Sequence, residues 1–97
     1  MPTFEWVAAF AADLARLTSS ERVAFERAVT QFVDDLRRGV GFQKGLRVKK
    51  VLSHQDIWEL TWAPDGRATV QYGPEQRPDE PHIIWRRIGG HEILKRP

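Results

Sequence analysis

The sequence predicts an α+β fold in which two N-terminal helices pack on one face of a mostly antiparallel sheet of four to five strands. Three observations predict it. Apolar residues recur at helical spacing in the first part of the chain, they alternate from residue 46 onward, and Gly and Pro separate the alternating runs. At 97 residues the chain has room for one two-layer core, so we expect residues 1–97 to form a single domain.

The N-terminal segment predicts a very short strand and then the first helix. Phe4 and Trp6 flank Glu5 in the alternation of a strand, with an early start of the helix as the alternative. From about Ala8, apolar residues recur at spacings of 4 and 3 as far as Leu17. This spacing predicts an amphipathic helix that ends at Leu17.

The second helix is the most clearly marked element. Thr18 and Glu21 have the spacing of a capping box, in which the Thr18 hydroxyl accepts from the Glu21 backbone N–H and the carboxylate reaches back. Gly39 supplies a left-handed stop after two arginines. One face of the helix is apolar and comprises Phe25, Ala28, Val29, Phe32, Val33 and Leu36.

The second half of the chain predicts four strands, because its apolar runs are rich in β-branched and aromatic residues. The turn Ala63-Pro64-Asp65-Gly66 indicates a hairpin, since proline presets one central residue and glycine allows positive φ. Longer loops are expected at Gly39–Gly45 and Gly73–Pro81. The four strands are Leu46–Leu52, Ile57–Trp62, Arg67–Tyr72 and His82–Ile88.

Charge is placed unevenly along the chain. Residues 1–45 hold 6 Lys and Arg against 6 Asp and Glu, whereas residues 46–97 hold 9 against 7. A sheet with one buried face can accept cations only on its wet face, so basic strands indicate a surface that suits an anionic chain such as RNA. An ordinary solvated face is the alternative for any single cation.

Several classes of site are excluded or disfavoured. The absence of cysteine excludes disulfides, a thiolate nucleophile and cysteine-based zinc sites. No histidine pair has metal-ligand spacing, no glycine-rich phosphate loop occurs, and His54 and His82 are expected at the surface, so we expect no metal and no cofactor. Neither a basic leader nor an apolar run of about 20 residues is present, so we expect a cytoplasmic protein without a membrane segment.

Alternation predicts which side chains share each face of the sheet. The face away from the helices is expected to carry Glu59 and Arg67, joined by Arg47 and Lys49 if Val48 belongs to the core. The face toward the helices is expected to carry Trp58, Leu60, Trp62, Ala68, Val70 and Tyr72.

The last strand admits two phases. Ile84 and Ile88 share a face with Arg86, while Ile83 and Trp85 share one with Arg87. We favour the phase that places Arg87 on the face away from the helices.

The chain resembles the RelE/ParE toxin superfamily over nearly its whole length. The resemblance is closer to the RelE/YoeB/HigB-like ribonuclease toxins than to the gyrase-directed ParE toxins. Its most specific parts are the Trp-Glu-Leu strand after a basic strand, the arginine that opens the next strand, and the histidine just past the last strand. The matching runs are Phe10-Ala11-Ala12-Asp13-Leu14, Gly45–Val51, Ile57–Trp62, Gly66-Arg67-Ala68-Thr69 and His91-Glu92-Ile93-Leu94.

The resemblance implies the toxin of a type II toxin–antitoxin pair, with a cognate antitoxin as partner, that cleaves mRNA on the ribosome without metal. The RNA 2′-hydroxyl attacks the adjacent phosphate. Arg67 would clamp the phosphate, His91 would be the general acid or base, and Lys49 could assist proton transfer. Glu59 is either a base or a strut that holds Arg67 by a salt bridge across adjacent strands.

The resemblance also implies residues that grip RNA. Cations are expected to contact the backbone, and an aromatic ring is expected to stack on a base. A gyrase poison of the same fold and a non-catalytic basic module that binds RNA or an acidic peptide are the alternatives. The expected RNA-binding residues are Arg47, Lys50, Arg86, Arg87, Lys95 and, for stacking, Trp85 or Tyr72.

Overall fold

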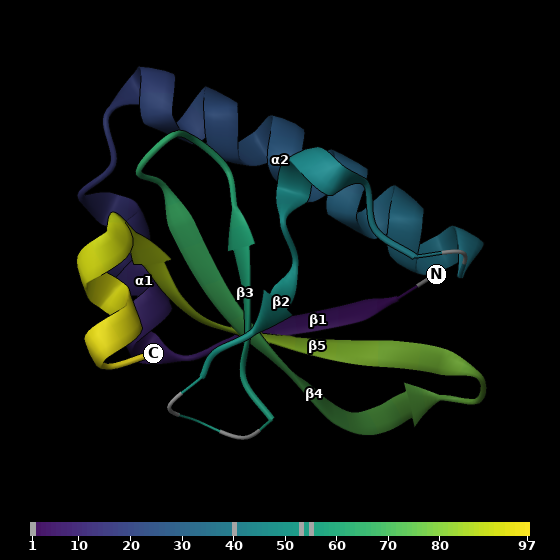
Figure 1. The fold of residues 1–97 in the computed structure, drawn as a ribbon. Helices are drawn as coiled ribbons and strands as arrows, with labels where there is room; N and C mark the ends of the chain where they lie inside the picture. Colours follow the sequence, from purple (N-terminus) through teal and green to yellow (C-terminus); the bar gives the residue numbers. More distant parts are fainter. Residues whose placement is uncertain (1, 40, 53, 55) are drawn as a thin grey trace.

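A five-stranded sheet carries two α-helices in the computed structural model, which describes residues 2–39, 41–52, 54 and 56–97 (Figure 1). Val40, in the predicted loop after the second helix, lies outside them. The strand order is β1-β5-β4-β3-β2, with β1 parallel to β5 and the other pairs antiparallel. The elements are β1 (Thr3–Trp6), α1 (Ala8–Ala15), α2 (Ser19–Arg38), β2 (Lys49–Lys50), β3 (Trp58–Thr61), β4 (Arg67–Arg77) and β5 (Glu80–Gly89).

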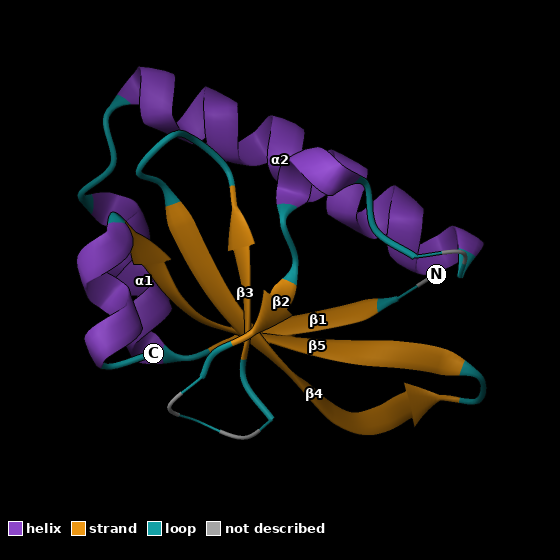
Figure 2. Ribbon diagram, in the orientation of Figure 1, coloured by secondary structure: helices purple, strands orange, loops and turns teal. Residues whose placement is uncertain are grey.

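The predicted α+β class is therefore confirmed. The long helix α2 crosses one face of the sheet, and α1 packs beside β5 (Figures 1 and 2). Two short 3-10 helices complete the fold, η1 (Lys44–Leu46) before β2 and η2 (His91–Lys95) after β5. We call the face of the sheet that points away from α2 the open face; η2 lies against β4 and β5.

The start and stop signals of α2 act as the sequence predicts. Thr18 Oγ1 accepts from the Glu21 backbone N–H at 3.2 Å, and the Glu21 carboxylate accepts from the Thr18 N–H at 2.8 Å. Gly39 ends the helix with φ of 69°, a left-handed conformation that glycine adopts without a Cβ penalty. The first helix ends at Ala15, earlier than the predicted Leu17.

Removing the cap of α2 is expected to destabilise the protein. We expect Thr18→Ala to lower the free energy of unfolding by about 1 kcal/mol, because the Glu21 backbone N–H loses its side-chain acceptor. Chemical denaturation measures this loss as a lower midpoint at an unchanged slope. Ser19→Ala, one residue inside the helix, is the matched control and should leave the midpoint near its wild-type value.

The core lies between α2 and the sheet and is rich in aromatic rings. The ring of Trp85 lies within 6 Å of three phenylalanine rings, with centroid distances of 5.7 Å to Phe10, 5.5 Å to Phe25 and 5.7 Å to Phe32. Only 6% of Trp85 is exposed. The prediction that Trp85 stacks on RNA bases is therefore wrong, because its ring is part of the core.

A bulge in β5 resolves the phase of the last strand. Thr69 lies opposite Arg87, whereas the next residue, Val70, lies opposite Trp85, so Arg86 is an additional residue in β5. The alternation between core-facing and outward-facing side chains along β5 therefore shifts by one residue at Arg86. Ile83 and Trp85 before the bulge and Ile88 after it all join the core, which neither uniform phase predicts.

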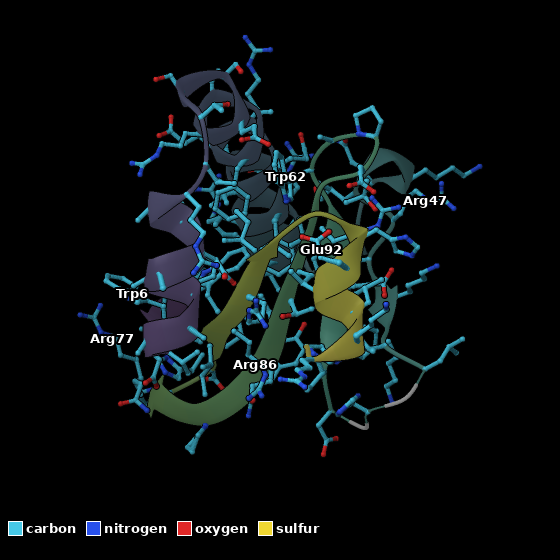
Figure 3. The ribbon with its side chains drawn as sticks, turned by 90° about the vertical axis from the view of Figure 1, so that its left-hand side faces the viewer. Trp6, Arg47, Trp62, Arg77, Arg86 and Glu92 are labelled. Atoms are coloured by element: carbon cyan, nitrogen blue, oxygen red, sulfur yellow. The ribbon has the colours of Figure 1, made fainter. Side chains whose placement is uncertain are left out.

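The predicted strand Leu46–Leu52 is reduced to β2, which contains only two residues. Leu46 belongs to η1 and is buried, and Arg47 follows it with φ of 50°, a left-handed conformation that interrupts an extended run. Arg47 therefore does not share a strand face with Lys49. It projects outward at the β2 side of the molecule (Figure 3).

The predicted loop Gly73–Pro81 is wrong, because β4 and β5 continue as a long hairpin through it. Arg77 pairs with Glu80, and Asp79 turns the chain with φ of 63°. Proline is tolerated in this part of β4 because β3 pairs only with residues 67–70, so the outer edge beyond them needs no backbone donor.

His82 is buried, although the sequence predicts it at the surface. Its Nδ1 lies 2.7 Å from Thr3 Oγ1, and its Nε2 lies 2.6 Å from Glu5 Oε1. The imidazole therefore joins β1 to β5 on the open face, in addition to the backbone pairing of Thr3 with His82.

Candidate functional site

One hollow gathers the four residues that the sequence predicts as catalytic. It has a volume of about 390 Å³, within the range of roughly 300–1,000 Å³ typical of ligand sites. Three cationic residues, one glutamate, one histidine and two leucines line it. The lining residues are Lys49, Lys50, Leu52, Glu59, Arg67, His91 and Leu94.

Strand register explains how residues distant in sequence meet. Lys49 of β2 lies opposite Glu59 of β3, so both side chains stand on the open face. Arg67 opens β4 opposite Gly89, the last residue of β5. His91 begins η2 two residues after Gly89, which brings its imidazole to the same hollow as Arg67.

Glu59 is the buried acid of this hollow. Only 7% of the residue is exposed, and Lys49 Nζ lies 3.8 Å from its Oε1. The predicted salt bridge from Glu59 to Arg67 is not among the ion pairs of the described residues; Lys49 takes the place of Arg67.

Lys50 lies over the Trp58 ring, with Nζ 5.4 Å from its centroid, in a cation–π contact.

Arg67 is held partly by the hairpin turn that precedes it. Its NH1 group donates to the carbonyl of Gly66 at 3.0 Å and to that of Pro64 at 3.3 Å, with a longer contact to Ala63. These contacts hold the guanidinium through its NH1 nitrogen alone. Nε and NH2 make no hydrogen bond to the described residues, so they are available to a phosphate oxygen.

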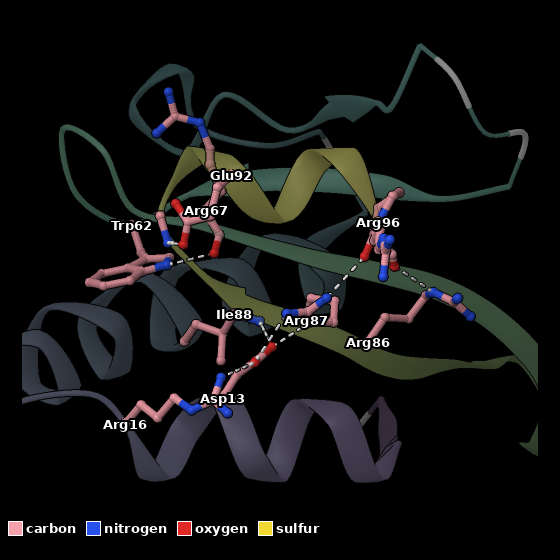
Figure 4. Close-up of polar contacts among 11 residues, drawn as sticks. Asp13, Arg16, Trp62, Arg67, Arg86, Arg87, Ile88, Glu92 and Arg96 are labelled. Atoms are coloured by element: carbon pink, nitrogen blue, oxygen red, sulfur yellow. Dashed lines mark hydrogen bonds and ion pairs between the residues drawn. The ribbon is translucent and has the colours of Figure 1, made fainter.

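The last-strand arginines are engaged within the protein. Arg86 donates to the Gln71 side chain and to the Pro97 carbonyl. Arg87 makes a two-nitrogen ion pair with the buried Asp13 (Figure 4). The hydrogen bond that Arg87 donates to Asp13 raises the pKa of Arg87. The charges of Asp13 and Glu92 add to this shift, and burial acts against it. Arg87 faces the open side as favoured, but its charge is neutralised by Asp13.

The remaining predicted RNA-binding residues lie away from the hollow. Tyr72 is half-exposed, on the sheet face that carries Val70 and beyond the cover of the helices, although it was expected in the core. Burial raises the pKa of its phenol. Lys95 is exposed at the end of η2 and lines a separate hollow with Arg86 and Arg96.

A second large hollow offers no acid–base chemistry. It lies between β1 and the two helices, has a volume of about 380 Å³, and contains no titratable side chain. Trp6 on its rim is 63% exposed (Figure 3).

Across the described ranges, no three His, Asp or Glu residues converge as a metal ion requires. Among those same ranges no helix has both the length and the apolar composition to cross a bilayer.

Sequence reasoning missed two kinds of residue. Leu52 and Leu94 border the catalytic candidates in the hollow, and no local pattern marks them for that role. Asp13 appears in the sequence as an ordinary helix carboxylate, yet it is 7% exposed and bonded to β5. An acid next to Leu14 on the apolar side of an amphipathic helix was the available signal.

Comparison with known proteins identifies the fold. Neither a family model nor a curated protein matches the chain. A chain of the E. coli DinJ–YafQ complex matches with a TM-score of 0.68 at 13% identity, covering 97% of this chain and 98% of that one. The RelB–RelE antitoxin–toxin complex from Methanococcus jannaschii gives a TM-score of 0.59 at 13% identity, with 93% of each chain covered.

A third similar structure is a copper-bound mutant toxin from Helicobacter pylori. It matches with a TM-score of 0.62 at 17% identity, and the alignment covers 97% of this chain and 99% of the toxin. Sequence identities of 13–17% support a shared fold and no further property. The chain therefore has the fold that these three structures share.

Proposed function

We propose that this protein is the toxin of a type II toxin–antitoxin pair and that it cleaves mRNA on the ribosome. One observation carries the proposal: Lys49, Lys50 and Arg67 line one hollow together with Glu59 and His91. Three cations suit a polyanionic backbone, and the carboxylate and imidazole offer proton acceptors and donors beside them. Structures with the same fold are named as toxins or as toxin–antitoxin complexes, which supports a toxin as the class of protein.

The proposed reaction uses the RNA's own nucleophile and no metal. The 2′-oxygen forms a bond to the adjacent phosphorus while the bond from phosphorus to the 5′-oxygen breaks, which leaves a 2′,3′-cyclic phosphate and a 5′-hydroxyl. One base takes the proton from the 2′-hydroxyl, and one acid gives a proton to the leaving 5′-oxygen. Negative charge grows on the non-bridging oxygens in between, where cations stabilise it.

The side chains of the hollow divide this work. Arg67 clamps the phosphate through the nitrogens that the hairpin carbonyls leave free. His91, exposed at the rim, acts as general acid or base. Glu59 is the second proton-transfer candidate, and its contact with Lys49 supports a role for this pair; Lys50 adds charge that holds the RNA.

Replacing Arg67 tests the proposal. Purified protein is incubated with translating ribosomes, and the mRNA ends are mapped. We expect wild-type protein to produce new ends and Arg67→Ala to reduce the cleavage rate by about 10²–10³-fold, because a charge-stabilising donor is lost. Arg38→Ala is the matched control, because Arg38 lies on the last turn of α2 and pairs only with Asp34 among the described contacts.

The outcomes separate the alternatives. An absence of new ends, or equal cleavage by wild type and Arg67→Ala, contradicts the proposed function. RNA binding that weakens steeply with salt but never leads to cleavage identifies a non-catalytic module instead. A loss of DNA gyrase supercoiling activity in the presence of the protein identifies a gyrase poison.

We also propose a cognate antitoxin as the protein partner. The DinJ–YafQ and RelB–RelE structures are both described as complexes of a toxin with an antitoxin. The cations of the hollow offer an acidic segment a docking site that also blocks RNA. Co-purification with the product of the neighbouring open reading frame tests this partner, and a failure to bind at low salt contradicts it.

A further inference from the structure

The segment after β5 returns to the strand that it leaves. It departs at Gly90, passes through η2, and comes back so that the carbonyls of Arg96 and Pro97 accept hydrogen bonds from β5 side chains. Arg87 NH1 lies 3.2 Å from the Arg96 oxygen, and Arg86 Nε lies 3.1 Å from the Pro97 oxygen. Residues 90–97 therefore form a loop that is closed on β5 at both ends (Figure 4).

Asp13 orients the guanidinium that closes this loop. Its Oδ2 accepts from Arg87 Nε at 2.6 Å and from the Ile88 backbone N–H at 3.2 Å, and its Oδ1 accepts from Arg87 NH2 at 3.2 Å. Two parallel bonds fix the plane of a guanidinium as well as its distance. The NH1 group of Arg87 is thereby left to point at Arg96.

η2 depends on these external contacts for its position. It is a 3-10 helix of five residues, a conformation with poor hydrogen-bond geometry. Its N-cap Gly90 has no side chain, and the Glu92 carboxylate accepts from the Gly90 backbone N–H only at 3.3 Å. Ile93 is buried beneath it, with 4% of its surface exposed. The buried isoleucine and the two arginine contacts are the anchors of the turn that begins with His91.

We propose that Asp13 is a positioning residue for the cleavage reaction: through Arg87 it fixes the η2 loop, and thereby the imidazole of His91 against Arg67 and Lys49. This inference rests on the proposed function. Asp13 does not line the hollow, so it acts through Arg87 and not on RNA.

The RNA-binding role expected for Arg87 predicts the opposite behaviour. If Arg87 binds RNA, replacing Asp13 frees its guanidinium, and RNA is held more tightly. If Arg87 anchors the loop, the same replacement leaves binding unchanged, because Lys49, Lys50 and Arg67 lie on other strands. The rate of the chemical step then falls, because His91 is less well placed.

The test compares full-length wild type with Asp13→Asn and Arg87→Lys. We expect both variants to lower kcat for mRNA cleavage by about 10–100-fold at an unchanged KM, since misplacement of a catalytic group acts on the chemical step. Arg87→Lys keeps the positive charge but cannot bond Asp13 and Arg96 together. Asp34→Asn is the matched control, because it removes a helix carboxylate whose partners are the surface residues Arg37 and Arg38.

Hydrogen exchange of residues 90–97, followed by mass spectrometry without RNA, gives a readout independent of activity. Faster exchange in Asp13→Asn or Arg87→Lys, with wild-type exchange in Asp34→Asn, supports the anchor. Unchanged exchange, unchanged kcat or a lower KM overturns the proposal. If wild type cleaves no RNA, the proposed function fails, and exchange alone decides whether Asp13 anchors the loop. If Asp13→Asn does not fold, the same readouts on Arg87→Lys decide.

Discussion

Replacing His91 with alanine is expected to lower the rate of mRNA cleavage by about 10²–10⁴-fold, the range for loss of a general acid or base. His91 is exposed at the rim of the hollow, where it meets solvent and a bound RNA alike. Lys49, Lys50 and Arg67, the cations proposed to hold RNA, lie on β2 and β4, so we expect KM to change little while kcat falls. Single-turnover cleavage on saturating ribosomes measures the effect.

Two further variants make this result specific to proton transfer. His91→Gln keeps a hydrogen-bonding side chain of similar size but cannot exchange a proton at neutral pH, so we expect it to be as slow as His91→Ala. His54→Ala removes an exposed histidine that does not line the hollow and should cleave at the wild-type rate. Cleavage at the wild-type rate by His91→Gln would show that the imidazole only fills space or binds RNA and does not transfer a proton.

The helices could be predicted from the sequence because their signals are local. Thr18 and Glu21 are three residues apart and bond to each other, and Gly39 stops the helix by its own conformational freedom. Neither interaction depends on the rest of the fold. The start and end of α2 were therefore predicted to within one residue.

The last strand could not be predicted from local alternation. Alternation assumes one residue per step, and the additional residue Arg86 breaks that rule where β5 meets Thr69. A bulge is favoured by packing across the sheet, which brings Trp85 and Ile88 into the same core. The stacking role of Trp85 was a consequence of assuming uniform phase.

Local alternation also decides which residues of the candidate site could be placed from the sequence. Glu59 and Arg67 were placed on one face by short strands with clear alternation, and the hollow contains both. Arg47 was placed with them by extending a strand through a left-handed residue. The pairing of Asp13 with Arg87 joins residues 74 positions apart and has no local signature at all.

Replacing Phe32 with alanine is expected to lower the free energy of unfolding by about 3–5 kcal/mol, the range for removing a buried aromatic side chain. Only 1% of Phe32 is exposed. Its ring stacks on Phe42 at a centroid distance of 5.1 Å and meets Trp85 edge-on at 5.7 Å. In a chain of this length each 1 kcal/mol lowers Tm by about 4–8 °C, so thermal unfolding resolves the loss readily.

Val23→Ala, on the same helix, is the matched control. Val23 is 48% exposed, so its replacement should change stability by no more than about 0.5 kcal/mol. Equal losses in the two variants would contradict the core assigned to α2. Phe32 packs on the face of the sheet opposite to Lys49 and Glu59. The folded fraction of Phe32→Ala should therefore still cleave mRNA at the wild-type rate. This result would separate an effect on stability from an effect on catalysis.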